Sequence, residues 1–483
     1  MKAIARTILT LCMVAGSGLQ VQAQLTNTLY FMHGVPQSNR INPAYQPVCS
    51  FYLGFPALSP LRLELSSNPL VWEDVIYPQD GELITFMHPD GDRDRFLRQL
   101  RGVNYVATDL GTTLGSLGFR TPIGFFSLEV ATRWDGNIYY PGDLVRLMIK
   151  GVENDVTYEL DGIGADLSLF NELSLGWSGQ LMENLYFGVR AKVLFGMANL
   201  STVSSDLSLY TSEERWTIQS DMQFNASLPF AEVTYGEEGE LPDIELNSDL
   251  ENLSSSTIPG YLLNGQNMGL GLDLGIDYRP IKQLRVSVSL TDLGYITWKD
   301  QVHEVSYRTN YDYIGLEVNP FEFSEDLSFG DYMDSTLNQM ADSLQGFLEF
   351  GESGPYTKRL NTKLYAGASF ELNKIISFGI LSRTDILNRR VAEQVTASVG
   401  FRFGRYWNPT VTYSYMNSSF NNIGFGYSFN LGPFNSYFVT DNLITALLWP
   451  ESTSSVNFWF GMNLMFGYKK LLKGPEADRP LVY

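Results

Sequence analysis

The sequence predicts an all-β protein, a transmembrane antiparallel β-barrel, and its clearest support is a long run of strict alternation. From residue 268 to 279, Met, Leu, Ile and Tyr alternate with Gly, Asp and Arg, and after a turn at 280–283 the alternation resumes with Leu and Val against Arg, Ser and Thr. Because a strand directs successive side chains to opposite faces, each half has one apolar face and one small or charged face. Each half is about ten to twelve residues long, which is enough to cross a bilayer as a tilted strand.

The connections between the predicted strands fall into two length classes. Residues 120–122 and 280–283 are short turns, whereas 135–164, 234–259 and 320–359 are long. Short periplasmic turns, long outer loops and an even number of strands are typical of outer-membrane barrels. The 13% aromatic content suits the aromatic girdles of such a barrel. We therefore predict about 14 strands, with short helices in the long outer loops.

The two ends of the chain are predicted to lie outside the barrel. Residues 1–23 have a basic start, a short apolar core and a Val-Gln-Ala cleavage pattern, which is typical of a secretory signal peptide. We expect residues 24–50 to form an N-terminal arm or hatch, 51–470 the barrel and 471–483 a periplasmic tail. The expected location is the outer membrane of a Gram-negative cell after removal of the signal peptide. Cys49, the one cysteine of the mature chain, is interpreted as a packed side chain because it has no partner for an internal disulfide.

The segment after the signal peptide is too irregular to span a membrane. Residues 24–47 do not alternate and contain several prolines, and unpaired backbone cannot face lipid. We therefore place this segment in the periplasm as an arm or inside the barrel as a hatch. The next two extended pieces, 51–55 and 61–65, are interrupted by prolines, and 68–103 is predicted as a long polar connection with a short helix at 92–101.

The remaining elements follow from the same alternation. The main predicted strands are 104–119, 123–134, 167–177, 187–195, 268–278, 284–290, 302–318, 360–370, 375–386, 395–403, 409–416, 423–429, 437–441 and 456–466. Phe170 and Asn171 break the alternation of their strand, which we interpret as a local bulge. Outer-loop helices are predicted at 142–150 and 332–347.

Charged side chains within the strands decide which face points to lipid. An Arg or Lys on the lipid face at mid-depth costs about 2–4 kcal/mol. The charged residues assigned to the lumen are Glu172, Arg190, Lys192, Asp273, Asp277, Arg285, Lys363 and Arg402. We interpret them as ion pairs across the lumen, with a polar substrate path as the alternative. A soluble β-sandwich or solenoid would share the alternation, but the wide aromatic faces and the two loop classes disfavour it.

No pattern in the sequence predicts catalysis, a cofactor or a metal site. The available histidines are His33 in the arm, His88 in a loop and His303, which we interpret as an ordinary rim residue. The carboxylates between 237 and 245 suit calcium by their chemistry, but their spacing matches no EF-hand, so a solvated acidic loop is preferred. The net charge of −20 disfavours a nucleic-acid partner.

Several short phrases carry a family resemblance. They are Asn42-Pro43-Ala44, GLGLDLG at 269–275, LTDLG at 290–294, VTDN at 439–442 and GMNL at 461–464. They resemble the Bacteroidota relatives of the FadL-type barrels, a superfamily that includes long-chain fatty acid transporters and PorV-like proteins of type IX secretion. The resemblance implies a 14-stranded barrel in which a hydrophobic ligand enters from outside, passes an N-terminal hatch and leaves through the wall. It also implies that Asn42, Pro43 and Ala44 belong to the hatch or gate.

Two functions are consistent with these observations. The first is FadL-like transport of small hydrophobic or amphipathic compounds, gated by residues 24–50. The alternative is a PorV-like accessory barrel whose outer loops dock a protein partner in secretion or surface assembly, without transport. The expected partners are outer-membrane lipid, a hydrophobic ligand and a protein at the outer loops, and we expect no enzymatic activity and no cofactor.

Overall fold

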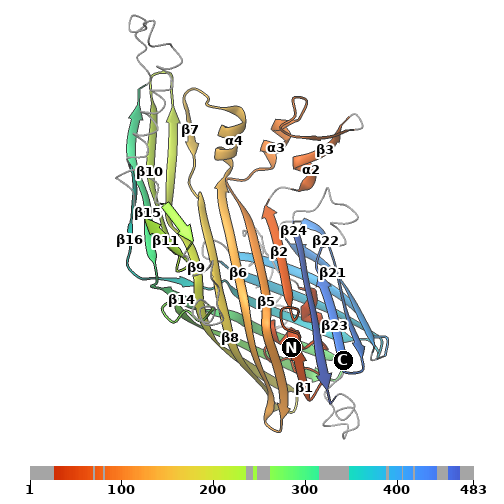
Figure 1. Ribbon diagram of the computed structural model, residues 1–483. Helices are drawn as coiled ribbons and strands as arrows, with labels where there is room; N and C mark the ends of the chain where they lie inside the picture. Colours follow the sequence, from red (N-terminus) through yellow and green to blue (C-terminus); the bar gives the residue numbers. More distant parts are fainter. Residues whose placement is uncertain are drawn as a thin grey trace, which may run out of the picture.

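The chain folds into a closed antiparallel β-barrel of 14 strands with few helices, as predicted (Figure 1). The structure is a computed structural model that describes residues 27–68, 71–79, 82–234, 243–246, 262–314, 347–387, 391–404, 406–416, 419–442 and 455–467. The expected signal peptide, the C-terminal tail and most of the helix predicted at 332–347 lie outside these ranges. None of the described helices combines the length and the apolar character needed to cross a membrane.

The wall contains more strand segments than barrel strands because several strands are interrupted. β1 (Phe51–Gly54) and β2 (Leu61–Asn68) both pair with β5 and β24 and therefore form one strand of the wall. The other wall segments are β5 (Val103–Thr121), β6 (Gly124–Pro141), β8 (Gly164–Met182), β9 (Leu185–Thr211), β13 (Met268–Ile281), β14 (Leu284–Trp298), β17 (Tyr356–Arg359), β18 (Thr362–Glu371), β19 (Ile376–Ile386), β20 (Val391–Phe401), β21 (Trp407–Met416), β22 (Ser419–Leu431), β23 (Phe434–Thr440) and β24 (Ser455–Phe466). Pairing of β24 with β1 and β2 closes the ring.

On one side of the barrel the wall continues well beyond the length needed to cross a membrane. β9 is 27 residues long, whereas a spanning strand needs about 9–11. Its first part pairs with β13 as far as Phe195, and its later part pairs with β10 (Trp216–Ser227) from Asn199 onward. β10 in turn pairs with β15 (Val302–Tyr313), and β15 with β16 (Leu348–Glu352). These strands and β7 (Val156–Glu159) form a projecting sheet, which Figure 1 shows rising above the barrel.

The outer connections carry small elements, some of which the sequence did not predict. α4 (Gly142–Lys150) matches its prediction, and α3 (Arg93–Gln99) is slightly shorter than predicted because the Asp92 side chain caps it by accepting a bond from the Arg95 N–H at 2.8 Å. The predicted polar connection 68–103 also contains α2 (Trp72–Val75) and the hairpin β3 (Ile76–Gln79) and β4 (Glu82–Thr85). A second hairpin pairs β11 (Ala231–Thr234), which ends where the long connection predicted at 234–259 begins, with β12 (Asp243–Leu246), which lies within that connection.

A bulge lies where the sequence alternation breaks. The register of β8 against β9 shifts between Leu169 and Phe170, which confirms the local irregularity predicted there. The extra residue, Met197, lies on β9, and Phe170 keeps the inward parity of Glu172 and Ser174. Phe170 is fully buried in a cluster with Leu194, Ile296, Trp298 and Leu360. Leu360, where the predicted strand 360–370 begins, lies between β17 and β18, and its side chain is buried in this cluster rather than facing outward with the apolar residues of β18.

The outward positions of the strands form an apolar surface. In the hairpin of β13 and β14, the side chains of Leu270, Ile276 and Val288 are exposed, whereas Asp273, Asp277, Ser287 and Ser289 are buried. This arrangement is the reverse of a water-soluble protein and is what a lipid environment requires. The buried Cys49 packs against Tyr52, Phe125 and Met465, as its interpretation required.

The outward surface gives a direct test of lipid exposure. Val288, the fifth residue of β14, lies about half way along the ~9–11 residues of a strand that cross a bilayer, and it is 45% exposed. Ile281, at the turn end of β13, is 54% exposed. We expect Val288→Arg to lower the free energy of unfolding by about 2–4 kcal/mol in lipid vesicles, and Ile281→Arg to cost about 0–1 kcal/mol, because the cost depends on depth in the bilayer. The measurement is the denaturant midpoint of each variant. Equal losses at the two positions would contradict a lipid-facing β14.

Candidate functional site

The N-terminal segment, residues 27–50, lies inside the barrel and is called the hatch from here on. It contains two short 3-10 turns, Thr28–Phe31 and Pro36–Arg40, and most of its side chains are buried. Its hydrogen bonds reach strands all around the ring. They include Thr28 N to Asp441 Oδ1 at 2.9 Å, Tyr30 Oη to Ser287 Oγ at 2.5 Å, Gln37 Nε2 to Asn463 Oδ1 at 2.7 Å, Arg40 Nε to Glu129 Oε2 at 2.9 Å and Gln46 Nε2 to the Ser178 carbonyl at 3.1 Å. The segment therefore fills the middle of the lumen.

Two glycines of the wall make room for the phrase Asn42-Pro43-Ala44. Gly188 on β9 and Gly275 on β13 are directly paired across the two strands. A Cβ on Gly275 would lie 2.1 Å from Asn42 Oδ1, and a Cβ on Gly188 would lie 2.1 Å from the Pro43 carbonyl carbon. Asn42 also donates from Nδ2 to the Ile276 carbonyl at 3.2 Å and accepts the Ala44 N–H at 2.9 Å. The three residues assigned to the hatch from sequence thus lie in a recess that only glycine leaves open.

A bulge in β14 creates the centre of the lumenal charge network. Leu272 pairs with Leu293 and Leu274 with Leu290, so Thr291 and Asp292 together lie opposite Asp273. Asp292 has a φ of 58°, a left-handed conformation that non-glycine residues rarely adopt. Its N–H donates to Asp273 Oδ1 at 2.7 Å, which stabilises the bulge. The bulge therefore turns the Asp292 side chain into the lumen.

Three cations from different strands converge on the Asp292 carboxylate. Arg133 Nη1 lies 2.8 Å from Oδ1, Lys192 Nζ lies 2.6 Å from Oδ1 and Lys363 Nζ lies 3.1 Å from Oδ2. Further carboxylates neutralise these cations: Lys192 contacts Asp273 at 2.7 Å and Arg133 contacts Glu172 at 3.2 Å. All of these side chains are buried. Such a cluster is tolerated at low dielectric because each charge has a close partner, and removing one partner would leave an uncompensated buried charge.

The hatch is joined to this network. Arg190 donates from Nη2 to Asn39 Oδ1 at 2.9 Å, and Arg40 of the hatch donates to Thr113 Oγ1 at 2.8 Å in addition to its bond with Glu129. A cavity of about 40 Å³ lies between the hatch and the network, lined in part by Arg40, Ile41 and Asp292. Its wall residues Asp292 and Lys363 lie farther from the short turns, along β14 and β18, than Gly275 of β13, which contacts the hatch. The cavity therefore lies on the outer-loop side of that contact.

The eight lumenal residues chosen from sequence fall into two groups. The first group, around Asp292, contains Glu172, Arg190, Lys192, Asp273 and Lys363. The second group lies near the short turns, where Asp277 contacts Arg285 at 3.2 Å and Arg279 at 2.8 Å, and Arg402 lies 3.9 Å from Glu371.

Sequence reasoning missed the residue at the centre of the first group. Asp292 was not selected, although the sequence carries a signal for it: the apolar stripe changes parity between Leu290 and Leu293. Arg133 was also missed, because it stood at the end of a strand that was predicted to stop at residue 134 but continues to Pro141.

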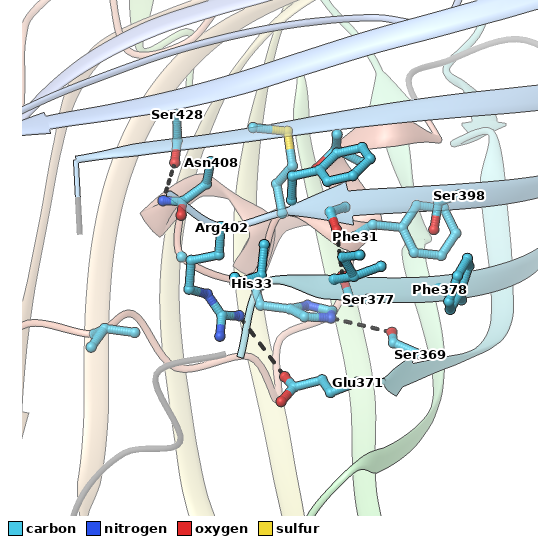
Figure 2. A pocket seen from close by; sticks show the side chains of 18 of the residues that line it. Phe31, His33, Ser369, Glu371, Ser377, Phe378, Ser398, Arg402, Asn408 and Ser428 are labelled. Atoms are coloured by element: carbon cyan, nitrogen blue, oxygen red, sulfur yellow. Dashed lines mark hydrogen bonds and ion pairs between the residues drawn. The ribbon is translucent and has the colours of Figure 1, made fainter. Parts of the chain in front are cut away.

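A second cavity, of about 110 Å³, lies at the turn end of the barrel between the hatch and β18–β22 (Figure 2). Its lining includes Phe31, Met32, His33, Gly34 and Val48 of the hatch and Ser369, Glu371, Ser377, Ser398, Arg402, Asn408, Thr410, Ser428 and Asn430 of the wall. His33 Nε2 lies 3.4 Å from Ser369 Oγ, and the two side chains meet across the boundary between hatch and wall. This cavity is therefore bounded by the hatch on one side and by polar strand residues on the other.

His33 is held in its neutral form by its surroundings. Burial, followed by the nearby guanidinium groups of Arg285, Arg279 and Arg402, holds the pKa of His33 well below its usual value. The unfolded chain binds a proton on this side chain below about pH 6.5 and the folded chain does not, so this residue weakens folding as the pH falls below that value.

The contact between Ser369 and His33 lacks the third member that a nucleophilic site requires. Such a site needs a base oriented by a further group, and His33 Nδ1 has no hydrogen-bond partner among the described residues. Within the same part of the chain, no group of three or more His, Cys, Asp or Glu side chains is placed to hold a metal ion. His303 is buried within the projecting sheet rather than placed in the lumen, and it pairs with Ala226 and Glu352.

The glycine recess gives a test of hatch docking. Because the added Cβ would overlap Asn42, we expect Gly275→Ala to displace the hatch and to lower the free energy of unfolding by about 1–3 kcal/mol, the usual cost of overpacking. Limited proteolysis should cut residues 27–50 faster in the variant. The control is Gly115→Ala, where a Cβ would meet nothing within 4 Å. Equal cleavage in the two variants would contradict the recess as a docking site.

Comparison with solved structures finds several barrels of similar extent. The toluene transporter TbuX of Ralstonia pickettii has 10% sequence identity and a TM-score of 0.41, and the match covers 89% of this chain and 94% of that chain. A FadL homologue of Pseudomonas aeruginosa has 10% identity and a TM-score of 0.40, covering 93% and 99%. The translocator domain of the autotransporter NalP from Neisseria meningitidis has 8% identity and a TM-score of 0.33, covering 91% and 96%.

Comparison by sequence identifies the family. A search of curated proteins finds no match. One family model, described as a family of unknown function, DUF5723, matches residues 43–441. This range begins within the hatch and ends at Asp441, which accepts a hydrogen bond from the Asn27 N–H of the hatch. Since this match spans most of the sequence, the chain belongs to the DUF5723 family.

Proposed function

We propose that this protein is an outer-membrane barrel through which small amphipathic compounds pass when the hatch moves. The observation that carries this proposal is the position of the hatch between two cavities. The cavity beside Asp292 lies on its outer side, and the larger cavity beside His33 lies on its turn side. A segment in this position controls whether the two sides of the lumen are connected. The apolar outer surface and the sequence of residues 1–23 support the location in the outer membrane.

The hatch is closed in this structure, so passage requires a conformational change. Apolar side chains of the hatch, including Leu29, Val35 and Tyr45, pack in one cluster with Leu381 and Trp459 of the wall. This packing joins the hatch to the wall on several strands. A compound can therefore cross only when part of the hatch leaves its place, which is the behaviour expected of a gate.

At the beginning of the hatch, one carboxylate accepts three hydrogen bonds. Asp441, just beyond the outer end of β23, accepts the Asn27 N–H at 2.5 Å, the Thr28 N–H at 2.9 Å and the Thr28 hydroxyl at 2.5 Å. Asp441 is fully buried. Hydrogen bonds to a charged group contribute about 1.5–3 kcal/mol each, so this carboxylate is a large part of what holds this end of the hatch.

Loosening this end of the hatch should open the barrel. We expect Asp441→Asn to raise the open fraction in planar-bilayer recordings by about tenfold or more, since losing one charge-assisted bond of about 1.4 kcal/mol corresponds to a factor of ten. Deletion of residues 24–47 should give a larger ionic current. The control is Asp221→Asn, which alters a carboxylate paired with Arg308 on the projecting sheet, outside the lumen. If the hatch deletion leaves the current at the wild-type level, the gate is not residues 27–50.

A second function, docking of a protein partner, is favoured by the projecting sheet. Its two faces differ: Asp221, Arg308 and Asp312 lie on one face, while Met222, Phe224, Val305, Tyr307, Tyr311 and Phe350 lie on the other. Ser201, which contacts the lumenal pair of Asp166 and Lys358, is paired with Asn225 on the polar face. The apolar face therefore continues the lipid-facing surface beyond the length that the bilayer covers, and contiguous apolar surface of this kind marks interaction sites.

The two functions are separable by mutating the projecting sheet. If the protein is an accessory barrel, Tyr307→Ser with Tyr311→Ser should remove a stoichiometric partner from the complex purified from the outer membrane and measured by native mass spectrometry. The matched control, Asn310→Ser, changes the polar face between these two positions. A wild-type barrel that purifies without a stoichiometric protein would count against docking and leave transport as the function.

A further inference from the structure

Hydroxyl and amide groups line the wall of the cavity beside His33, together with the apolar side chains of Ile375, Ile376, Phe378 and Phe401. The hydroxyl and amide groups come from five consecutive strands, β18 to β22, and the ones used in this argument are Ser369, Ser377, Ser398, Asn408, Thr410 and Ser428. Each hydroxyl or amide group can both donate and accept hydrogen bonds. Figure 2 shows Ser369, Ser377, Ser398, Asn408 and Ser428 around one space.

These groups are poorly satisfied by one another. Asn408 Nδ2 lies 3.3 Å from Ser428 Oγ, and Ser377 Oγ lies 3.5 Å from the Gly400 carbonyl. Both distances exceed the usual 2.7–3.0 Å or so of good hydrogen bonds. By contrast, Ser289 on the packed part of the wall donates to the Ile41 carbonyl at 2.6 Å. Asn408 Oδ1 and His33 Nδ1 have no partner at all within the described residues. The cavity therefore offers hydrogen-bonding capacity that the protein itself does not use.

The opposite side of the cavity is apolar. Phe31, Met32 and Val48 of the hatch face the polar wall together with Met465. An apolar compound would satisfy this side but would leave the hydroxyl and amide groups of the wall unpaired, which costs about 1–3 kcal/mol for each buried group. A compound with a ring face and several hydroxyl groups would satisfy both sides.

The size of the cavity and the charge of its lining narrow the class of ligand further. The cavity of about 110 Å³ is of the order of the ~150 Å³ space that holds a benzene-sized molecule, so a single ring fits. Glu371 and Arg402, which both line the cavity, face each other at 3.9 Å and so offset each other's charge. Building on the proposed passage function, we propose that this cavity binds an uncharged, ring-sized compound with several hydroxyl groups, of the monosaccharide class.

Equilibrium dialysis with two probes of similar size tests this assignment. The protein is placed in lipid nanodiscs, and the probes are L-arabinose, a ring with several hydroxyl groups, and cyclohexanol, a ring with one; empty nanodiscs give the background. We expect saturable retention of arabinose and no retention of cyclohexanol above background. The double variant Ser398→Ala with Thr410→Val should bind arabinose at least about tenfold more weakly, the effect of losing one or two hydrogen bonds.

The control variant is Ser174→Ala, an inward-facing and buried serine on β8 that does not line this cavity. It should bind arabinose as the wild type does, and the melting temperatures of both variants show whether each has folded. Retention of cyclohexanol instead of arabinose would overturn the class of ligand. Unchanged arabinose binding in the double variant would show that the cavity is not the binding site. If neither arabinose nor cyclohexanol bound, the inference would be overturned altogether. The current recordings on Asp441→Asn measure ion flow and alter another part of the lumen. A negative result in the dialysis experiment therefore does not contradict the proposed gate. A negative result in the current recordings contradicts the gate without bearing on sugar binding.

Discussion

The requirement that every lipid-facing backbone group be paired within the protein is the constraint on which this structure depends. It is met because β24 pairs with β1 and β2, which closes the ring. The same requirement explains how the wall tolerates the irregular stretch between β1 and β2. There the Phe55 N–H donates to the Met462 carbonyl at 3.0 Å and the Ala57 N–H to the Thr113 carbonyl at 2.7 Å, so the neighbouring strands satisfy the backbone even where no regular strand exists.

Closure in turn determines what the inside of the barrel must contain. A ring of 14 strands encloses more space than its own side chains fill, and the remaining space is occupied by the hatch and by charged residues. The desolvation cost of burying these charges is offset there because Arg133, Lys192 and Lys363 all contact the Asp292 carboxylate. The hatch docks nearer the short turns than these charged residues, where paired glycines on β9 and β13 leave a recess. Gate, network and cavities are thus consequences of one closed wall.

Much of the fold follows from the sequence, because the alternation of a strand that faces lipid on one side and a polar lumen on the other is strict. The number of strands and the bulge at Phe170 were predictable for this reason. Elements outside the membrane were harder: α2, β3 and β4 are short and lie in a polar segment whose composition resembles a loop. The length of β9 was underestimated, since outside the bilayer a strand no longer needs a continuous apolar face.

The candidate site was less predictable than the fold. Alternation assigns a side chain to the lumen, and it placed Lys192 and Lys363 in the set of lumenal residues, but it does not say which lumenal residues meet. That information depends on the stagger of distant strands, such as β6 and β14, which bring Arg133 to Asp292. The cavity beside His33 has the same origin, because it exists only where the hatch stops short of β18–β22, and no local pattern in the sequence records that distance.

The attachment of the hatch at Asp441 has a consequence for the order of assembly. Asn27 and Thr28 are the first described residues of the chain, yet their partners, Gln394, Thr412 and Asp441, belong to its last quarter. Contacts between such distant parts of a chain form late, because a long loop must close before they contribute any stability. The beginning of the hatch therefore remains undocked until the strands up to β23 have formed. A segment that is synthesised before every strand of the wall is therefore among the last to reach its native place, and an incompletely inserted barrel has an unplugged lumen.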